Sequence, residues 1–308
     1  MTLKQLRFLR EISRQSFNIS AAAIALHTSQ PGVSRQIQLL EQELGTDLLV
    51  RRTNRILGIT EAGRSILVAA ERLLNETENI ALIAADTRNE AAGRLVLATS
   101  HLHARYTLPG PVRAFSKRYP DVQLHLLQAE PDDIQKLVES RDADIGVSTE
   151  LTGQQSGLVQ IQAGTIQRSL IMPKGHPLCR KKRITLRDFS GYPVVSYHPR
   201  TRGGQIIAQA FNEAGVSIRH VVSASDSDVI KAYVAEGLGI AVVPTIALDR
   251  RADTRLEAVD VTRLFAASIM AISLRPGTHL RRYLTDMIQL VVPQLSREAV
   301  ERAMHPVE

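Results

Sequence analysis

Cysteine is almost absent from this 308-residue chain, which contains Cys179 and no second one. A lone cysteine excludes an intrachain disulfide and fits a reducing compartment. Long apolar runs are missing as well, because no stretch approaches the roughly 18 consecutive apolar residues of a membrane-spanning helix. The first residues, MTLKQLRFLREISRQ, are amphipathic and charged, unlike a signal peptide. We therefore expect a cytoplasmic protein without a membrane segment.

Signatures of catalysis are also lacking. We find no G-x-S-x-G, no G-x-G-x-x-G after the first strand expected in the C-terminal part, and no Walker loop. His101 and His103 are two residues apart, but no cysteine or acidic cluster joins them with metal-ligand spacing. The sequence therefore predicts no enzymatic activity, no cofactor and no bound metal.

Basic charge and apolar content are both plentiful. The formal net charge is +7, which favours a polyanionic partner, and 44% of the residues are hydrophobic, which indicates a globular fold. At about 150 residues per domain, the length predicts about two domains.

The N-terminal part predicts three short helices. Thr2 and Gln5 match a capping box, Ser20 can cap a second helix, and Ser29 can cap a third with Pro31 in its first turn. Gly45 is expected to end that third helix. Leu48 to Arg52 and Ile56 to Ile59 then predict two short strands around a basic turn. Three helices followed by a hairpin match the winged helix-turn-helix plan, whose third helix enters the major groove of DNA.

Two sets of side chains are predicted to face DNA. Arginine can bridge two acceptors of guanine, glutamine can pair with adenine, and basic residues on the hairpin can meet phosphates or the minor groove. The predicted contacts are Ser29, Gln30, Pro31, Ser34, Arg35 and Gln38 on the third helix, and Arg51, Arg52 and Arg55 on the hairpin.

A long helix is expected to follow, starting after Thr60. Its apolar positions advance in steps of four and three, the spacing of a heptad seam: Ile66, Ala70, Leu73, Thr77, Ile80 and Ala84. We expect the helix to pair with its own copy, although packing on its own domain would also explain the pattern.

Beyond Gly93 the pattern changes to alternating strands and helices, which predicts an α/β architecture with largely parallel sheets in two sub-domains. The strands are expected near 95–98, 122–127, 145–147, 170–172, 194–195, 240–243 and 269–274, and the helices near 108–118, 131–140, 203–214, 227–236 and 279–291. Ligands bind at the carboxyl ends of strands in such sheets. The candidate ligand residues are Thr99, Ser100, His101, Leu102, His103, Thr149, Thr201, Arg202, Ser225 and Asp226.

Several motifs carry a family resemblance. The runs AAAIALHTSQPGVS, LEQELG and TEAG fit the patterns A-x-x-L-x-x-(S/T)-Q-(P/S)-x-(V/I)-S, L-E-x-x-L-G and T-x-A-G. They resemble the DNA-binding domain of LysR-type transcriptional regulators. The resemblance implies a winged helix-turn-helix at 1–59, a dimerisation helix at 60–92 and a two-lobed effector domain of periplasmic-binding-protein type at 93–308. Lobe I would span about 93–165 and 268–308, and lobe II about 166–267.

The same resemblance implies partners. They are double-stranded DNA, a small effector, RNA polymerase and further copies of the chain, arranged as a homodimer or a homotetramer.

Three sequence segments of the C-terminal part are similar to the CysB/Cbl branch of that family. The segments are TSHLHARYTLPGPVRAFSKRYPDVQLHLLQ, ADIGVSTE and SDSDVIKAYVAEGLGI. That branch governs the assimilation of sulfate and sulfonates and the biosynthesis of cysteine. The implied effector is sulfate, thiosulfate, an acetylserine or adenosine phosphosulfate. The positions that carry over are Ser100, Leu102, His103 and Thr149, with Arg202 or the neighbouring Thr201.

This sequence also departs from that branch. Leu102 replaces a hydroxyl, His103 replaces an amide, and Gly164 and Ile166 replace aromatic residues. Two alternatives therefore stay open. One is a LysR-type regulator of another pathway with an unrelated effector, such as an aromatic acid, and the other is a solute-binding protein for sulfur-containing anions.

Overall fold

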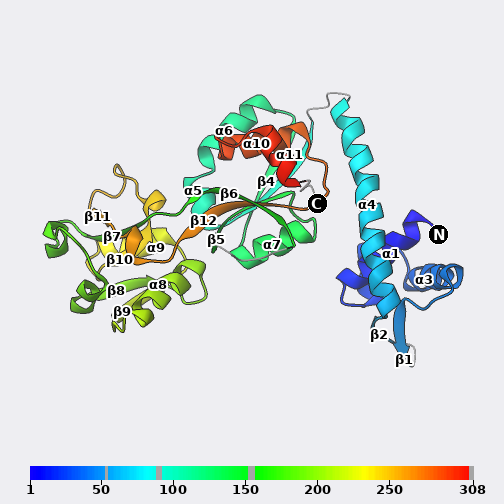
Figure 1. Cartoon of the computed structure of the whole chain (residues 1–308), viewed down its shortest axis with the longest axis horizontal. Coiled ribbons are helices and arrows are strands. Elements are labelled where there is room, and N and C mark those ends of the chain that lie inside the picture. Colours follow the sequence, from blue (N-terminus) through cyan, green and yellow to red (C-terminus); the bar gives the residue numbers. More distant parts are fainter. Residues whose placement is uncertain (53–54, 88–91, 152–156, 305–308) are drawn as a thin grey trace. The chain divides into compact units, whose positions relative to one another are not determined.

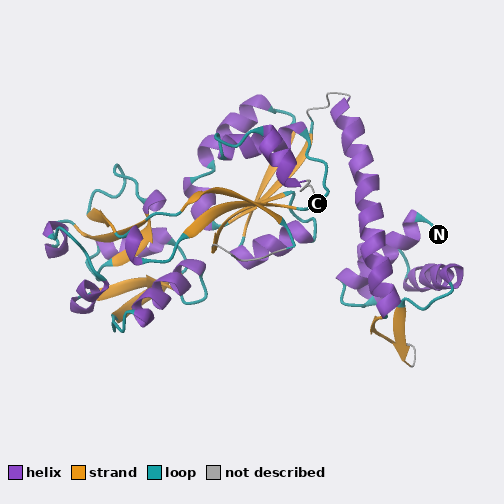
Figure 2. Ribbon diagram, viewed as in Figure 1, coloured by secondary structure: helices purple, strands orange, loops and turns teal. Residues whose placement is uncertain are grey.

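The computed structural model describes residues 1–52, 55–87, 92–151 and 157–304. The chain forms two compact units, Met1–Asn89 and Glu90–Glu308, each with its own hydrophobic packing (Figures 1 and 2). None of the helices in the described ranges combines the length and the apolar character that crossing a bilayer requires.

The N-terminal unit has the predicted order of helices and hairpin. Its elements are α1 (Leu3–Arg14), α2 (Ile19–Ala25), α3 (Gln30–Leu44), β1 (Leu49–Arg52), β2 (Arg55–Ile59) and α4 (Glu61–Thr87). The capping box of Thr2 and Gln5 forms as predicted, and the hydroxyl of Ser29 accepts from the backbone N–H of Gly32. Asn18, not Ser20, caps α2. The helix begins at Ile19, so Ser20 lies inside it, and the side chain of Asn18 accepts from the N–H of Ala21.

A buried carboxylate joins α3 to the hairpin. Glu41 is 6% exposed, and its Oε1 accepts from the backbone N–H groups of Leu48 at 2.9 Å and Leu49 at 3.2 Å. Its Oε2 pairs with Arg51 at 2.8 Å. Two buried amides and one guanidinium therefore depend on a single side chain, which fixes the start of the hairpin against the helix.

Close packing in the same region explains the threonine and the glycine of the T-x-A-G motif. Thr60 accepts from the N–H of Gly63 at 2.9 Å, so it caps α4 as predicted. A Cβ atom at Gly63 would lie 2.2 Å from the carbonyl oxygen of Leu48, well inside van der Waals contact. The absence of a side chain at Gly63 lets α4 approach the strand of the hairpin.

The long helix α4 has one buried face and one exposed apolar face. Ala70 and Leu74 are buried in the N-terminal core, against which Ile66 also packs. Leu73 and Ile80 are 39% and 66% exposed. One part of the predicted seam therefore packs within the N-terminal unit, and the other part is exposed.

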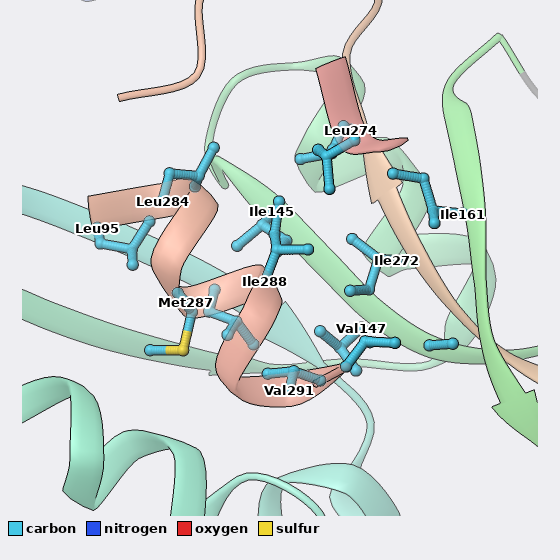
Figure 3. Close-up of a cluster of buried hydrophobic side chains, with 14 of the residues drawn as sticks. Leu95, Ile145, Val147, Ile161, Ile272, Leu274, Leu284, Met287, Ile288 and Val291 are labelled. Atoms are coloured by element: carbon cyan, nitrogen blue, oxygen red, sulfur yellow. The ribbon is translucent and has the colours of Figure 1, made fainter. Parts of the chain in front are cut away.

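Lobe I of the C-terminal unit is built on a five-stranded sheet in the order β4-β3-β5-β12-β6. Its elements are β3 (Gly93–Thr99), α5 (His101–Tyr106), α6 (Pro109–Arg118), β4 (Val122–Gln128), α7 (Pro131–Glu139), β5 (Ile145–Leu151), β6 (Val159–Thr165), β12 (Ser268–Leu274), α10 (Arg282–Val291) and α11 (Arg297–Met304). Helices α6 and α10 cover one face of the sheet, and α7 covers the other (Figure 1). Leu95, Ile145 and Ile272 meet Met287 and Ile288 of α10 in the main core (Figure 3).

Lobe II has a separate core formed by residues between 170 and 265. Its elements are β7 (Arg168–Pro173), β8 (Pro193–Tyr197), α8 (Arg202–Glu213), β9 (Arg219–Ala224), α9 (Ser227–Ala235), β10 (Ala241–Pro244) and β11 (Leu256–Asp260), with short 3-10 turns between them. The chain enters lobe II after β6 and returns to lobe I at β12.

The prediction of largely parallel sheets is wrong. The strand β12 pairs antiparallel with β5 and β6, and β7 pairs antiparallel with β10 and β11. The pairs β3–β4, β3–β5 and β8–β9 are parallel. A strand that returns from the other lobe arrives without a helical crossover, so it can run against its neighbours.

We expect Glu41→Ala to lower the free energy of unfolding by about 3 kcal/mol, because it leaves buried amides unpaired and removes the partner of Arg51. Glu41→Gln keeps a carbonyl acceptor, so its loss should be smaller. Urea unfolding followed by circular dichroism measures both. Glu43→Ala, on an exposed position of the same helix, is the control. Equal losses for Glu41→Ala and Glu43→Ala would contradict the structural role of Glu41.

Candidate functional site

Helix α3 presents one polar side away from its buried stripe. The stripe comprises Val33, Ile37, Leu40 and Glu41, and the predicted DNA-facing residues Ser29, Gln30, Pro31, Arg35 and Gln38 are exposed, with Ser34 half-buried. Among the described residues of this unit, Arg35 takes part in none of the ion pairs. Its guanidinium is therefore available to the two acceptors of a guanine.

The hairpin residues divide into different roles. Arg52 is exposed, as a phosphate contact requires, whereas Arg51 pairs with the buried Glu41. Arg55 begins β2, and its side chain lies outside the described part of the structure, as do Thr53 and Asn54 at the turn. Arg51 thus has a structural partner that the sequence pattern did not indicate.

The second site is a cleft of about 110 Å³ between the lobes of the C-terminal unit. Eight of the ten predicted ligand residues line it: Ser100, His101, Leu102, Thr149, Thr201, Arg202, Ser225 and Asp226. The strand-end rule explains this result, because β3, β5 and β8 all end at the cleft. At its edges Thr201 caps α8 through the N–H of Gly204, and Asp226 caps α9 through the N–H of Val229.

Thr99 and His103 do not line the cleft. Both are fully buried, and the hydroxyl of Thr99 donates to the carbonyl of Val147 at 2.9 Å. The imidazole of His103 joins Thr107 through Nδ1 and Thr149 through Nε2, each at 3.0 Å. Burial lowers the pKa of His103 to about 4. The neutral ring therefore supports Thr149, a cleft residue, from behind.

Sequence reasoning missed four polar residues that line the cleft, namely Glu130, Arg168, Tyr197 and Ser227. The hydroxyls of Tyr197 and Ser227 are 2.5 Å apart, and burial raises the pKa of Tyr197. Arg168 is 4% exposed. Arg168 opens the strand RSLIMP, but its partner Ser268 is distant in the chain, so no local pattern marked it as a buried cleft residue.

Ionic contacts join the two lobes around the cleft. Arg202 of α8 pairs with Asp132 of α7 at 3.1 Å. On α9, Asp228 accepts from Tyr106 and contacts His101 at 3.2 Å, while Lys231 donates to Tyr106 at 3.0 Å. These contacts link the lobes in the arrangement that the structure shows, and the partly exposed ion pair of Arg202 and Asp132 contributes little free energy.

One cluster of side chains could be considered for a metal ion. The ligand atoms of His101, Asp226 and Asp228 all lie within 4.8 Å of one another. Asp228, however, already has Lys231 at 3.4 Å and Arg105 at 3.9 Å. A metal ion would have to compete with two cations for the same carboxylate, so the donor set fits an inter-lobe contact better than a metal centre.

Comparison with known proteins covers both units. Residues 3–64 match the bacterial regulatory helix-turn-helix protein of the lysR family, and residues 88–296 match the LysR substrate binding domain. The chain is 39% identical over 300 residues to the HTH-type transcriptional regulator SsuR of Burkholderia cenocepacia, covering 97% of each protein. It is 38% identical over 304 residues to the HTH-type transcriptional regulator CysB of the same organism, covering 99% of this chain and 97% of CysB.

The C-terminal unit also resembles the solved structure of a domain from a related regulator. The cofactor-binding domain of the Cbl transcriptional regulator aligns with a TM-score of 0.64 at 34% identity, covering 70% of this chain and 95% of that domain.

We expect the burial of His103 to make stability depend on pH. Because the folded-state pKa of about 4 lies below the ordinary value of 6.5, the unfolded chain takes up the proton first. Stability is therefore complete above about pH 6.5 and falls toward pH 4, with a loss of about 2 kcal/mol between pH 7 and pH 5.

Urea unfolding of the wild type and of His103→Gln at both pH values measures this contribution. The variant should lack that part of the pH dependence, whatever its stability at pH 7. His125→Gln, on the exposed side of β4, should behave as the wild type. A pH slope that His103→Gln leaves unchanged would refute the assignment.

Proposed function

The chain belongs to the LysR family of bacterial transcriptional regulators, and on that premise we propose that it reads an operator through α3 and responds to a ligand in the inter-lobe cleft. The observation that carries the DNA-binding role is the row of Gln30, Arg35 and Gln38, exposed on a helix that is capped at both ends. Side chains on a fixed helix can meet base edges in register. Arg52 supplies a phosphate contact beside them.

We propose that the regulated genes serve the assimilation of sulfate and sulfonates in the cytoplasm. Support comes from the near full-length similarity to SsuR and CysB, together with the Cbl-like effector domain. The function is regulatory and not enzymatic, since the relatives are transcriptional regulators. RNA polymerase is the expected protein partner of a DNA-bound regulator.

The proposed switch is a population shift. A ligand that contacts both lobes favours the arrangement of lobes that it fits best, by as much as its affinity differs between arrangements. Arg202 and Asp132 across the cleft, and Asp228 with Tyr106 behind it, are the contacts that would change. Because the lobes belong to one chain with the DNA-binding unit, the change can reach DNA through the arrangement of paired subunits.

The proposed assembly is a homodimer or a homotetramer built of dimers. Leu73 and Ile80 of α4 lie on the predicted seam and are exposed within one chain. Exposed large apolar residues repeated along a helix indicate a partner surface.

Arg35→Ala should reduce the preference for an operator over scrambled DNA, at a cost of about 1–3 kcal/mol on the operator. The operator is first selected by the wild type from random duplexes, and affinities are then measured by fluorescence anisotropy. Arg52→Ala is the matched comparison, because the loss of a phosphate contact should weaken both duplexes equally and flatten the salt dependence. If Arg35→Ala discriminates between the two duplexes as the wild type does, α3 is not the reading element.

Ile80→Glu should raise the dissociation constant of the dimer at least about tenfold, because each subunit would lose an apolar contact and bring a charge into the seam. Sedimentation over a range of concentrations measures the change. Val68→Glu is the control, since Val68 is 50% exposed on the same helix but lies off the seam. Equal effects of the two substitutions would count against the predicted seam.

A further inference from the structure

Arg168 is a buried cation without a carboxylate partner among the described residues. Its Nη1 donates to the carbonyl of Ala266 at 3.2 Å and its Nη2 to the hydroxyl of Ser268 at 2.7 Å. Both acceptors are neutral, and burial lowers the pKa of the guanidinium. A charge removed from water without a counter-ion is costly, so an anion that reached it would be strongly favoured. Arg168 lines the cleft, where such an anion can arrive.

The other arginine of the cleft is already engaged. Arg202 pairs with Asp132 at 3.1 Å and donates to Gln205 at 3.3 Å. The sequence placed Arg202, or the neighbouring Thr201, among the predicted effector contacts. The structure favours Arg168 as the charged contact, since no acidic side chain among the described residues neutralises it.

A hydroxyl in the same cleft also lacks a partner. The Oγ of Ser100 is buried and forms no hydrogen bond within the described structure. A buried hydroxyl without a partner lowers stability, and a ligand acceptor would remove that cost. Ser100 belongs to lobe I and Arg168 to lobe II, so a ligand that used both would join the lobes.

Polar side chains such as Thr149, Ser225 and Asp226 share the cleft with an aliphatic part of the wall. That part is formed by Leu102, Ile166, Ile206, Ile207, Val242, Val243 and Pro244. These side chains donate no hydrogen bonds, and a doubly charged inorganic anion would lose its hydration against them without compensation. An apolar group would instead gain from burial on the same surface. Leu102 and Ile166 are two of the departures from the CysB/Cbl pattern, so this wall differs from a lining for a bare oxyanion.

We propose that the cleft binds a singly charged organic anion, with its acidic group on Arg168 and an apolar body of a few carbons against the aliphatic wall. This inference rests on the proposed function, because it names the ligand to which the regulator responds. Sulfonates and carboxylates share the required chemistry. Sulfate and thiosulfate, which have no apolar body, are the poorer ligands.

The position of Arg168 links this ligand to lobe movement. Arg168 opens β7 just after the chain enters lobe II, and its partner Ser268 opens β12 just after the chain returns. The two crossing segments are further joined by the N–H of Ile166, which donates to the carbonyl of Ser268 at 2.9 Å. An anion on Arg168 therefore contacts the point about which the lobes can turn.

Binding to the full-length protein tests the proposal by calorimetry and thermal shift. The probes are sodium sulfate, methanesulfonate, butanesulfonate, butanoate, benzenesulfonate and butan-1-ol, all at one ionic strength. At least one of the larger organic anions should bind ten or more times as tightly as sulfate, and butan-1-ol should not bind measurably. The butanesulfonate and butanoate arms distinguish a sulfonate effector from a carboxylate effector. Sulfate binding as tightly as every organic anion, or no binding by any probe, overturns the proposal.

Arg168→Gln should lose at least tenfold in affinity for the best organic anion, and Arg168→Lys should keep more of it. Arg183→Gln removes an exposed arginine that does not line the cleft and should bind as the wild type. Unchanged binding by a folded Arg168→Gln overturns the role of Arg168. If Arg168→Gln does not fold, the lysine variant and the probe series on the wild type still decide.

Operator binding is measured separately on the same preparation. A chain that binds organic anions but selects no DNA would refute the proposed function and leave only the anion site of the cleft standing. A chain that selects DNA but prefers sulfate would refute this inference alone.

Discussion

The side chain of Arg168 joins the two segments in which the C-terminal chain crosses between its lobes. Its hydrogen bonds to Ala266 and Ser268 tie the start of β7 to the start of β12. The lobes have separate hydrophobic cores, so these hydrogen bonds and the polar contacts around the cleft, rather than a shared core, join the lobes. A buried charge without a counter-ion is costly. An anion bound in the cleft would offset that cost, so anion binding there is favoured.

The contacts around the cleft are of a different kind. Asp132 and Arg202, and Asp228 with its neighbours, are partly exposed, and exposed ion pairs contribute little free energy each. The C-terminal unit thus combines two separate hydrophobic cores with a small set of polar contacts between them. The population shift that we propose would exchange those contacts and leave the cores packed.

In the N-terminal unit, by contrast, the helix and the hairpin are joined by buried contacts. Caps at both ends of α3, the buried Glu41 and the close approach at Gly63 leave little freedom between the helix and the hairpin. A fixed helix suits the recognition of DNA, because its side chains must lie within hydrogen-bonding distance of base edges.

Local patterns in the sequence determined the elements that depend on local physics. The capping box of Thr2, the cap and stop of α3 at Ser29 and Gly45, and the polar row of Gln30, Arg35 and Gln38 all follow from side chains within a few residues of one another. The strand-end rule also identified most of the cleft, because β3 and β5 run parallel, as do β8 and β9, and the carboxyl ends of parallel strands lie at one edge of a sheet.

Only the tertiary structure decided the rest, because those features depend on residues distant in the chain. The strands β6, β9 and β11 have weak apolar patterns and are held by their neighbours, and the antiparallel return of β12 follows from the passage between lobes. Arg51 takes its partner from α3, and His103 is buried beneath Thr149. Arg168 is about a hundred residues from the serine that holds it, so neither its burial nor its place at the crossing is encoded in its surroundings along the chain.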